Sequence, residues 1–297
     1  MNHEPYASIV TRLYPGAKLK AMDRLTGGVS ADVHRLDLSL PDGGNISLVL
    51  RAHGASHSGH SAELEHQLLQ ALHRSGVPVP EPLLVDVSGS LLAVPFLVMA
   101  FVEGTSVVPS GKESQNIDLM ADALANIHSM PATSLPTLPL RNDPLPDVLE
   151  YLPEGPAWQD LRAHLATQVD TAYRYSPKLL HGDFWPENLL WHNGAIAAIL
   201  DWEDAALGDP LSDVACARVE LRYKYGKASM ERFTRTYARH HGVDRARLAL
   251  WQVYVAAAAQ KFMGGWGLEP AREAHMRAEA LASIREAGAL LMGRASG

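Results

Sequence analysis

The sequence predicts an α+β protein with two lobes, an N-terminal lobe over residues 1–102 and a C-terminal lobe over residues 105–297. Three observations predict this class. Residues 33–40 and 45–51 alternate apolar and polar side chains, as half-buried strands do. From about residue 114 the apolar side chains recur with the period of a helix. Asn193-Gly194 lies between two apolar runs, which predicts a β-hairpin inside the otherwise helical half.

The N-terminal lobe is expected to be an antiparallel sheet with one helix. Pro41-Asp42-Gly43-Gly44 is a turn signal between the first two strands. Ser61 can cap a helix that runs to about Ser75 and ends at Gly76. Four runs have the apolar content of strands: residues 33–40, 45–51, 83–87 and 91–102.

The C-terminal lobe is expected to be mostly helical. Its first helix stacks Ile117, Met120, Leu124 and Ile127 on one face. Residues 131–157 hold seven prolines, too many for a helix interior, and predict a long connecting loop. Further helical patterns occupy residues 158–174, 211–225, 228–241, 245–263 and 270–292, to within a few positions.

The composition excludes several classes of protein. Of 297 residues, 47% are hydrophobic and 20% are charged, which is typical of a globular chain and not of a disordered one. The net charge is −7 and no basic run occurs, which disfavours nucleic-acid binding. The longest nearly apolar stretch, residues 91–102, is too short to span a membrane. A single cysteine, Cys216, and a first segment without signal-peptide features predict a cytoplasmic protein.

The segment 179–213 is the most informative part of the sequence. If its Asn-Gly pair forms a two-residue turn, Asn188 should face Ile199 across the hairpin, and Asp201 should lie on a nearby rung. The two polar side chains would then lie at the open end of the hairpin, roughly 7 Å apart on the diagonal. One amide oxygen and one carboxylate suit Mg²⁺ that is held partly by substrate phosphates.

Asp183 precedes Asn188 by five residues in a proline-containing loop, which places it beside the same predicted site. A carboxylate there can accept a proton from an attacking hydroxyl group. The simpler alternative is a capped turn followed by an ordinary hairpin with a structural Asp201. Three residues of the right type at the right spacing favour the catalytic interpretation.

The spacing of Asp183, Asn188 and Asp201 is that of a protein-kinase catalytic loop and its metal-binding aspartate. The variant H-G-D-x-x-x-x-N, followed by D-W-E-D-A and G-D-P, resembles the aminoglycoside phosphotransferase family, which is related in fold to choline/ethanolamine and fructosamine kinases. The resemblance extends over nearly the whole chain and implies a two-lobed, protein-kinase-like fold with a hinge at about residues 99–104. It also implies Asp183 as the catalytic base and Asn188 and Asp201 as Mg²⁺ ligands, with His181 bracing the loop.

The same resemblance implies a nucleotide site in the N-terminal lobe. The run Leu25-Thr26-Gly27-Gly28-Val29-Ser30 is similar to the loop that covers the phosphates in that family, and residues 99–104 are similar to the segment that holds adenine. The implied nucleotide contacts are Gly27, Gly28 and Ser30 at the phosphates, Met99 as gatekeeper, and the backbones of Ala100 and Val102 as adenine partners.

Arg51 occupies the strand position where that family normally has a lysine for the α- and β-phosphates. Arginine offers a planar fork of donors in place of a point charge. Its helical partner follows from periodicity, because the positions three, four and seven after Glu65 are all leucine, whereas those after Glu63 are polar. Glu65 should therefore face inward and pair with Arg51.

Other polar residues have structural explanations. Asp209 and Asp213 are expected to be caps or buried hydrogen-bond acceptors near the helix at 211, and His181 a hydrogen-bonded structural histidine. The histidine cluster that begins at His53 lies in a Gly/Ser-rich loop without regular ligand spacing, which predicts a solvated loop and not a metal site.

The sequence thus predicts a small-molecule kinase that transfers the γ-phosphate of ATP, or of GTP, to a hydroxyl group of a small acceptor. A metal-dependent hydrolase that uses His181, Asp183, Asp201 and Glu203 is one alternative, and a catalytically silent nucleotide-binding module is another. The acceptor stays open among aminoglycosides, macrolides, amino alcohols and sugars. The residues offer no indication of the oligomeric state.

Overall fold

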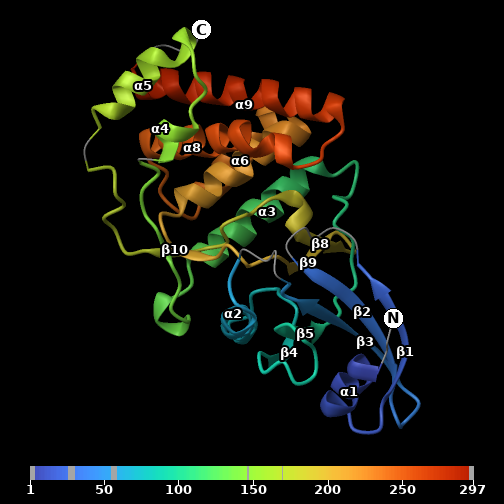
Figure 1. The fold of residues 1–297 in the computed structure, drawn as a ribbon. Coiled ribbons are helices and arrows are strands. Elements are labelled where there is room, and N and C mark those ends of the chain that lie inside the picture. Colours follow the sequence, from blue (N-terminus) through green and yellow to red (C-terminus); the bar gives the residue numbers. More distant parts are fainter. Residues whose placement is uncertain (1–3, 26–30, 55–58, 146, 169, 294–297) are drawn as a thin grey trace. The chain divides into compact units, whose positions relative to one another are not determined.

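The chain divides into two compact units, each of which is described by itself (Figure 1). The computed structural model describes residues 4–25, 31–54, 59–145, 147–168 and 170–293. Unit 1 comprises Met1–Thr105, Ser134–Thr137 and Leu189–Asp204. Unit 2 comprises Ser106–Thr133, Leu138–Asn188 and Ala205–Gly297. The hairpin after residue 188 therefore groups with the N-terminal unit, although the segments before and after it belong to unit 2.

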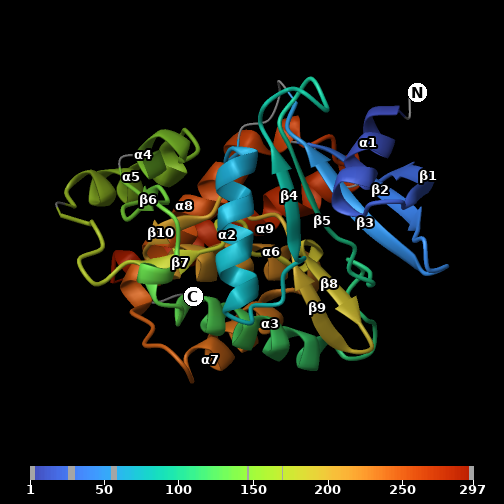
Figure 2. The same cartoon turned by 90° about the horizontal axis from the view of Figure 1, so that it is seen from below.

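Unit 1 is built on a five-stranded antiparallel sheet in the order β1-β2-β3-β5-β4 (Figure 2). Its strands are β1 (Lys18–Arg24), β2 (Asp32–Ser39), β3 (Asn45–Ala52), β4 (Pro82–Asp86) and β5 (Phe96–Ala100). The predicted hairpin of β2 and β3 is confirmed, since Asp32 pairs with Ala52 and Ser39 with Asn45. Alternate residues such as Leu36, Leu48 and Leu50 form a fully buried core face, which α1 (Glu4–Leu13) covers.

The other face of β3 carries Arg51, because side chains alternate along a strand and Leu50 points into the core. Helix α2 (Ala62–Arg74) begins where predicted, with Ser61 Oγ accepting a hydrogen bond of 3.2 Å from Leu64 N. Glu65 lies among its buried residues. Figure 2 shows α2 beside β4 and β5.

Two sequence expectations for unit 1 were wrong. The strand predicted from residue 91 begins only at Phe96, because Pro95 has no N–H for a ladder and its carbonyl instead accepts from His53 N at 2.8 Å. Helix α1 and strand β1 were not anticipated; most of the residues of β1 are exposed, so they lack the apolar alternation of a half-buried strand.

The hairpin of β8 (Leu189–His192) and β9 (Ala195–Ile199) has the predicted turn but not the predicted register. Asn193 and Gly194 have φ angles of 51° and 78°, as a turn with two left-handed residues requires. A bulge between Leu190 and Trp191 shifts the pairing, so that Leu189, and not Asn188, faces Ile199. The expectation that Asn188 faces Ile199 was therefore wrong.

Backbone contacts explain why this hairpin groups with unit 1. Thr105 and Trp191 exchange two hydrogen bonds, of 3.1 and 2.8 Å. Ile199 N donates to Pro78 O at 2.7 Å. Both partners lie in the N-terminal part of the chain, so the hairpin is tied to the segment after α2 and to the segment after β5.

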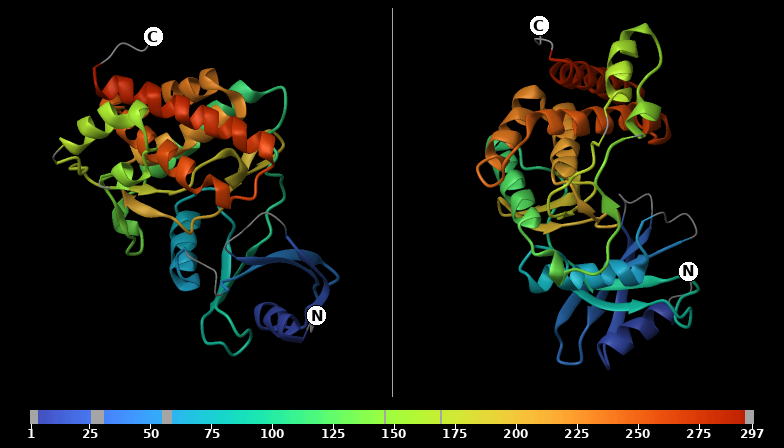
Figure 3. Two further views of the ribbon diagram at one scale, coloured as in Figure 1. Left: turned by 45° about the horizontal axis from the view of Figure 1, so that its top comes forward. Right: turned by 90° about the vertical axis from the view of Figure 1, so that its left-hand side faces the viewer.

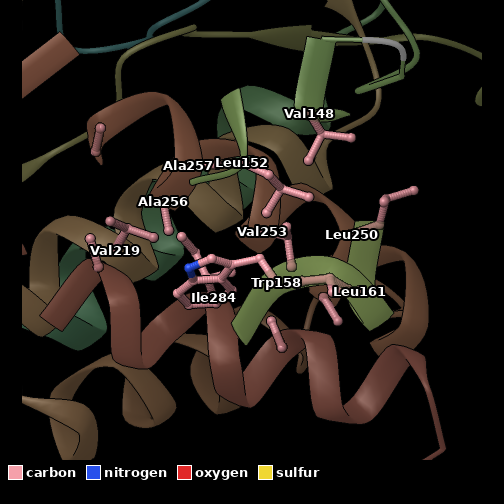
Figure 4. Close-up of a cluster of buried hydrophobic side chains, with 14 of the residues drawn as sticks. Val148, Leu152, Trp158, Leu161, Val219, Leu250, Val253, Ala256, Ala257 and Ile284 are labelled. Atoms are coloured by element: carbon pink, nitrogen blue, oxygen red, sulfur yellow. The ribbon is translucent and has the colours of Figure 1, made fainter. Parts of the chain in front are cut away.

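Unit 2 is mostly helical, as predicted (Figure 3). Its α-helices are α3 (Glu113–His128), α4 (Asp147–Tyr151), α5 (Gln159–Ala166), α6 (Leu211–Tyr225), α7 (Lys227–Tyr237), α8 (Arg245–Phe262) and α9 (Pro270–Leu291). Figure 4 shows Val148, Leu161, Val253 and Ile284 of four of these helices directed toward one another. The helix predicted over 158–174 is shorter, because the chain after Ala166 leaves the helix and Tyr173 N donates to Asn142 O.

A three-stranded sheet in unit 2 leads into the predicted catalytic loop. Its order is β6 (Leu140–Arg141), β10 (Ala206–Gly208) and β7 (Lys178–Leu180). A Cβ atom on Gly208 would lie 2.0 Å from the carbonyl oxygen of Arg141, so only glycine allows β6 and β10 to approach this closely. Within the described residues, no helix has the length and apolar content needed to cross a membrane.

Candidate active site

Arg51 is the centre of a charged cluster in unit 1. Its side chain is 12% exposed and meets three carboxylates. Both terminal guanidinium nitrogens lie 3.1 Å from Asp201 Oδ1, and one of them also bonds to Glu203. The Nε atom lies 3.5 Å from Glu65 Oε2, so the predicted ion pair of Arg51 and Glu65 is present. Burial alone would lower the pKa of Arg51, but the three carboxylates outweigh it and raise that pKa.

The sequence did not predict that His53 and Glu203 would belong to this cluster. His53 is 6% exposed and its Nε2 lies 3.1 Å from Glu65 Oε2, so the expected solvated loop was wrong for this histidine. Glu203 was considered only for a hydrolase, yet it bonds to Arg51. No pattern in the sequence links Glu203 to Arg51, which is 152 residues away.

Asp201 lies in a short irregular segment after β9. It has a left-handed backbone with φ of 62°, which is uncommon for a residue other than glycine and often marks a functional site. Trp202 Nε1 donates to Ile199 O at 3.1 Å, and Glu203 O accepts from His60 N at 3.0 Å. The segment is thus held by hydrogen bonds on both sides of the carboxylate, whose side chain is 32% exposed.

Asp183 and Asn188 come together in the predicted catalytic loop of unit 2. Asn188 Nδ2 donates to Asp183 O at 2.9 Å and to Asp183 Oδ2 at 3.2 Å. Because the amide nitrogen of Asn188 donates to Asp183, the amide oxygen is the atom of this side chain that remains as an acceptor for another group. The arrangement fits an oxygen ligand for a metal ion beside a carboxylate that receives a proton.

A buried aspartate fixes the backbone of this loop. Asp213, which is 1% exposed, accepts from His181 N at 2.6 Å and from Gly182 N at 3.0 Å. His128 Nε2 also lies 3.3 Å from Asp213, and its Nδ1 lies 2.7 Å from Tyr237 Oη. Burial alone would raise the pKa of Asp213, but these hydrogen bonds lower it. The expectation of buried acceptors is confirmed for Asp213, and the position of Asp183 depends on this network.

A pocket of about 280 Å³ lies beside the catalytic loop in unit 2. Its walls are Trp185, Pro186 and Glu187 of the loop, Glu220, Tyr223 and Lys224 of α6, and Arg272, His275 and Met276 of α9. Trp185 Nε1 and Tyr223 Oη are buried and have no hydrogen-bond partner among the described residues. Burial, and then the nearby charges of Asp183 and Glu187, raise the pKa of Glu220 to about 8.

These pocket residues were missed by sequence reasoning. Glu220 and Tyr223 lie three residues apart, so they share one face of α6, and this was the available signal. For Trp185 the sequence is equally compatible with a packing residue and with a substrate platform. Unpartnered buried polar atoms and a strongly shifted pKa in a concave site are features of binding sites.

The remaining predicted nucleotide residues lie in unit 1. Gly27, Gly28 and Ser30 fall outside the described residues. Met99 is 8% exposed and pairs with Val49, and Ala100 N donates to Glu81 O at 2.9 Å; Val102 follows the end of β5. Their expected role at adenine stays a prediction.

The ligand set predicted for Mg²⁺ consists of hard oxygen donors, the Asn188 amide and the Asp201 carboxylate. No group of three or more His, Cys, Asp or Glu side chains that could hold a metal occurs in the described part of the chain. Mg²⁺ is commonly held by one or two protein carboxylates or amides together with substrate phosphates and water. The donor types present therefore fit this ion.

Comparisons with known proteins identify the family of the chain. A model of the phosphotransferase enzyme family matches residues 23–251. A curated relative, acyl-CoA dehydrogenase family member 10 of Mus musculus, is 31% identical over 179 residues, which are 53% of this chain and 16% of that protein. The chain thus spans less than a third of the length of this relative.

Solved structures share the fold. A candidate aminoglycoside phosphotransferase from Ralstonia eutropha JMP134 has a TM-score of 0.71 at 17% identity, with 99% of each chain covered. A thermostable variant of aminoglycoside phosphotransferase APH(4)-Ia, in a complex with ADP and hygromycin B, has a TM-score of 0.60 at 16% identity, with 94% of this chain and 97% of that chain covered. The mixed architecture, with an antiparallel N-terminal sheet and a helical C-terminal part, is that of kinase-like phosphotransferases.

Proposed function

Because the chain belongs to the phosphotransferase enzyme family, we propose that it transfers the γ-phosphate of ATP, or of GTP, to a hydroxyl group of a small molecule. The observation that carries this proposal is the catalytic loop. In that loop Asn188 is bonded to Asp183, and Asp213 holds the backbone of His181 and Gly182. Such a loop presents one carboxylate and one amide oxygen in a fixed orientation.

In this proposal Asp183 orients the acceptor hydroxyl and takes its proton during transfer. Phosphoryl transfer leaves little covalent chemistry to the protein, so positioning and charge neutralisation supply most of the rate enhancement. Asn188 and Asp201 would hold Mg²⁺, which when bound neutralises charge on the β- and γ-phosphates. The bond between Asn188 and Asp183 ties the orientation of the base to that of the proposed ligand.

Arg51 is proposed to bind the phosphates, with Glu65 holding its guanidinium and His53 in turn contacting Glu65. Gly27, Gly28 and Ser30 would cover the phosphates, and Met99 with the Ala100 and Val102 backbones would hold the base of the nucleotide. The ADP bound to a neighbour of the same fold supports nucleotide binding by this architecture.

The pocket beside the catalytic loop is the proposed site of the acceptor. It begins two residues after Asp183, at Trp185, and its volume suits a small molecule or one ring of a larger one. The unpartnered Trp185 Nε1 and Tyr223 Oη would hydrogen-bond to polar groups of the acceptor. Hygromycin B in the neighbour's complex supports a small-molecule acceptor for this fold.

The hydrolase alternative is less well supported by the geometry. His181 is fully buried and its Nδ1 accepts from Asp183 N at 3.3 Å, so its ring is used within the loop. Glu203 is bonded to Arg51 and does not meet a group of other metal-binding side chains within the described residues. A silent module is disfavoured because the three residues that the chemistry requires, Asp183, Asn188 and Asp201, are all present.

The test is a phosphate-transfer screen with ATP and Mg²⁺ over a library of hydroxyl-bearing small molecules, read by mass spectrometry. Replacement Asp183→Asn should lower kcat by about 10²–10⁴ with the acceptor that is found, because the base is lost, while nucleotide affinity stays near the parent value. The exposed Asp204→Asn variant is the charge-matched control and should keep full activity. Substantial transfer by the Asp183→Asn enzyme would contradict the assignment of the base.

A further inference from the structure

A second cavity in unit 2 has no part in the proposed transfer reaction. It lies among α6, α7, α8 and α9 and has a volume of about 410 Å³, within the range of small-ligand pockets. None of its lining residues belongs to the pocket beside the catalytic loop. The cavity is therefore a separate concave surface on the helical unit.

The cavity is positively charged on a negatively charged protein. Its basic lining residues are Arg218, Lys227, Arg235 and Arg245, and its acidic ones are Glu231 and Glu286. Two positive charges are thus in excess here, whereas the whole chain carries −7. Glu286 is also shared between two cations, since it lies 3.0 Å from Arg222 and 2.9 Å from Lys227. A local field of this sign attracts anions and repels cations.

Arg218 is the buried cation of this cavity. It is 7% exposed, and its orientation is fixed by Gln252, whose Oε1 accepts from Arg218 Nε at 2.8 Å and whose Nε2 donates to Ser283 Oγ at 2.8 Å. Its carboxylate partner is Glu231, at 3.1 Å, and that side chain is 42% exposed. A buried guanidinium needs a counterion, and here a half-exposed one from the next helix supplies it.

The rim of the cavity carries two further guanidinium groups. The side chains of Arg235 and Arg245 are exposed and form no hydrogen bond or ion pair with any described residue. Between the cations the wall is apolar, with Leu248 buried and Leu290 at the edge. The cavity thus combines a fixed guanidinium, two uncommitted ones and an apolar surface.

We propose that this cavity binds a small oxyanion, a phosphate or carboxylate, that carries an apolar group. Guanidinium groups match the planar geometry of both oxyanions and bind them with two hydrogen bonds at once. The apolar group would lie against Leu248 and Leu290. The two terminal nitrogens of Arg218 donate to Thr234 and to Glu231, so the ligand competes with both for this guanidinium and with Glu231 for its charge.

The probe is phenyl phosphate, titrated by calorimetry into the full chain in metal-free buffer without nucleotide. Phenylacetate tests the carboxylate form of the same ligand class, and benzyl alcohol is the uncharged control. We expect both anions to bind with a stoichiometry of one at this cavity, and the Arg218 Nε–H signal to shift in an NMR titration. Benzyl alcohol should not bind, because it offers no charge to the guanidinium groups.

Variants with opposite expected effects locate the binding. Arg235→Gln with Arg245→Gln should weaken phenyl phosphate binding about fivefold or more, because two exposed ion pairs are lost. Glu231→Gln should tighten it, because the competing carboxylate is removed. Arg74→Gln with Arg174→Gln removes the same charge at exposed positions outside the cavity and should leave the affinity unchanged.

Three results would overturn the proposal. The first is no binding of either anion up to about 10 mM, which corresponds to a binding free energy weaker than about 3 kcal/mol. The second is equal binding of benzyl alcohol, which would make the cavity merely apolar. The third is an equal loss of affinity in the rim variant and in the control variant, which would mean that only the overall charge matters. All of these are independent of phosphate transfer, so they do not depend on the proposed reaction.

Discussion

Replacement of Arg51 by glutamine should tighten the binding of Mg²⁺ to the nucleotide-free protein while it weakens the binding of ATP. The guanidinium that is proposed to hold phosphates is bonded to Asp201, which is proposed to hold the metal. A divalent cation that binds Asp201 must therefore displace Arg51 from this carboxylate. Glutamine removes the competing charge but also removes the partner of the phosphates, so the two ligands should respond in opposite directions.

The size of the effect follows from the contacts that the metal has to break. Hydrogen bonds between charged groups contribute about 1.5–3 kcal/mol each. Asp201 is 32% exposed, so water screens its bonds to Arg51 and the lower end of this range applies. A difference of about 1.5 kcal/mol is close to a tenfold gain in metal affinity. Arg51→Lys should fall between the parent and Arg51→Gln, because lysine keeps the charge and loses the fork.

The assay is Mn²⁺ binding followed by electron paramagnetic resonance in the absence of nucleotide, with Mg²⁺ as competitor. Arg35→Gln is the matched control, because Arg35 lies on the neighbouring strand and bonds to Asp37. Asp201→Ala should abolish metal binding if the proposed ligand is correct. If Arg51→Gln binds metal no more tightly than the parent while Asp201→Ala binds none, Arg51 does not compete with the metal for Asp201. The assignment of Asp201 as a ligand would then still stand.

Three further predictions concern stability and coupling. Burial raises the pKa of Glu220 to about 8, so between about pH 5 and 8 the folded protein holds a proton that the unfolded chain has released, and its stability falls as the pH rises. The free energy of unfolding of Glu220→Gln should therefore rise relative to that of the parent by roughly 1–3 kcal/mol as the pH goes from 5 to 8, measured by urea unfolding. The same pH dependence in both proteins would contradict this. Gly208→Ala should lower the free energy of unfolding by about 2 kcal/mol or more, since its methyl group would meet Arg141 O, and an unchanged urea midpoint would refute the clash. Arg51→Ala and Glu65→Gln should each lower kcat/KM for ATP, with the double variant losing less than the sum; strict additivity would show that the pair is not coupled.

Local signals predicted a large part of the fold. Helix α2 begins at Ser61 and turns Glu65 inward because a capping side chain and a row of leucines are both encoded within one segment. Helix α6 begins and ends where the pattern predicted, at Leu211 and Tyr225. Both cases depend on residues that are near one another in the chain.

Other features depend on distant residues and could not be predicted in this way. The backbone of the predicted catalytic loop is held by Asp213, which reaches it only after α6 has packed. Glu203, a partner of Arg51, is brought there by the hairpin, and the proposed acceptor pocket combines Trp185 with α6 and α9. The turn residues specified the hairpin but not the bulge, because a bulge depends on how both strands pack against the chain around them.

The bulge in the β8–β9 hairpin gives the two ends of this hairpin separate registers. Leu189 and Leu190 pair in one register, and Trp191 and His192 pair in another that is shifted by one residue. A change in the length of the Asn193-Gly194 turn acts first on the outer register, and the bulge together with the two hydrogen bonds between Trp191 and Thr105 separates the turn from the end that leads to Asp201. This turn is a suitable position for inserting a peptide tag or a reporter domain, because the inserted chain would leave the side-chain orientation at the functional end unchanged.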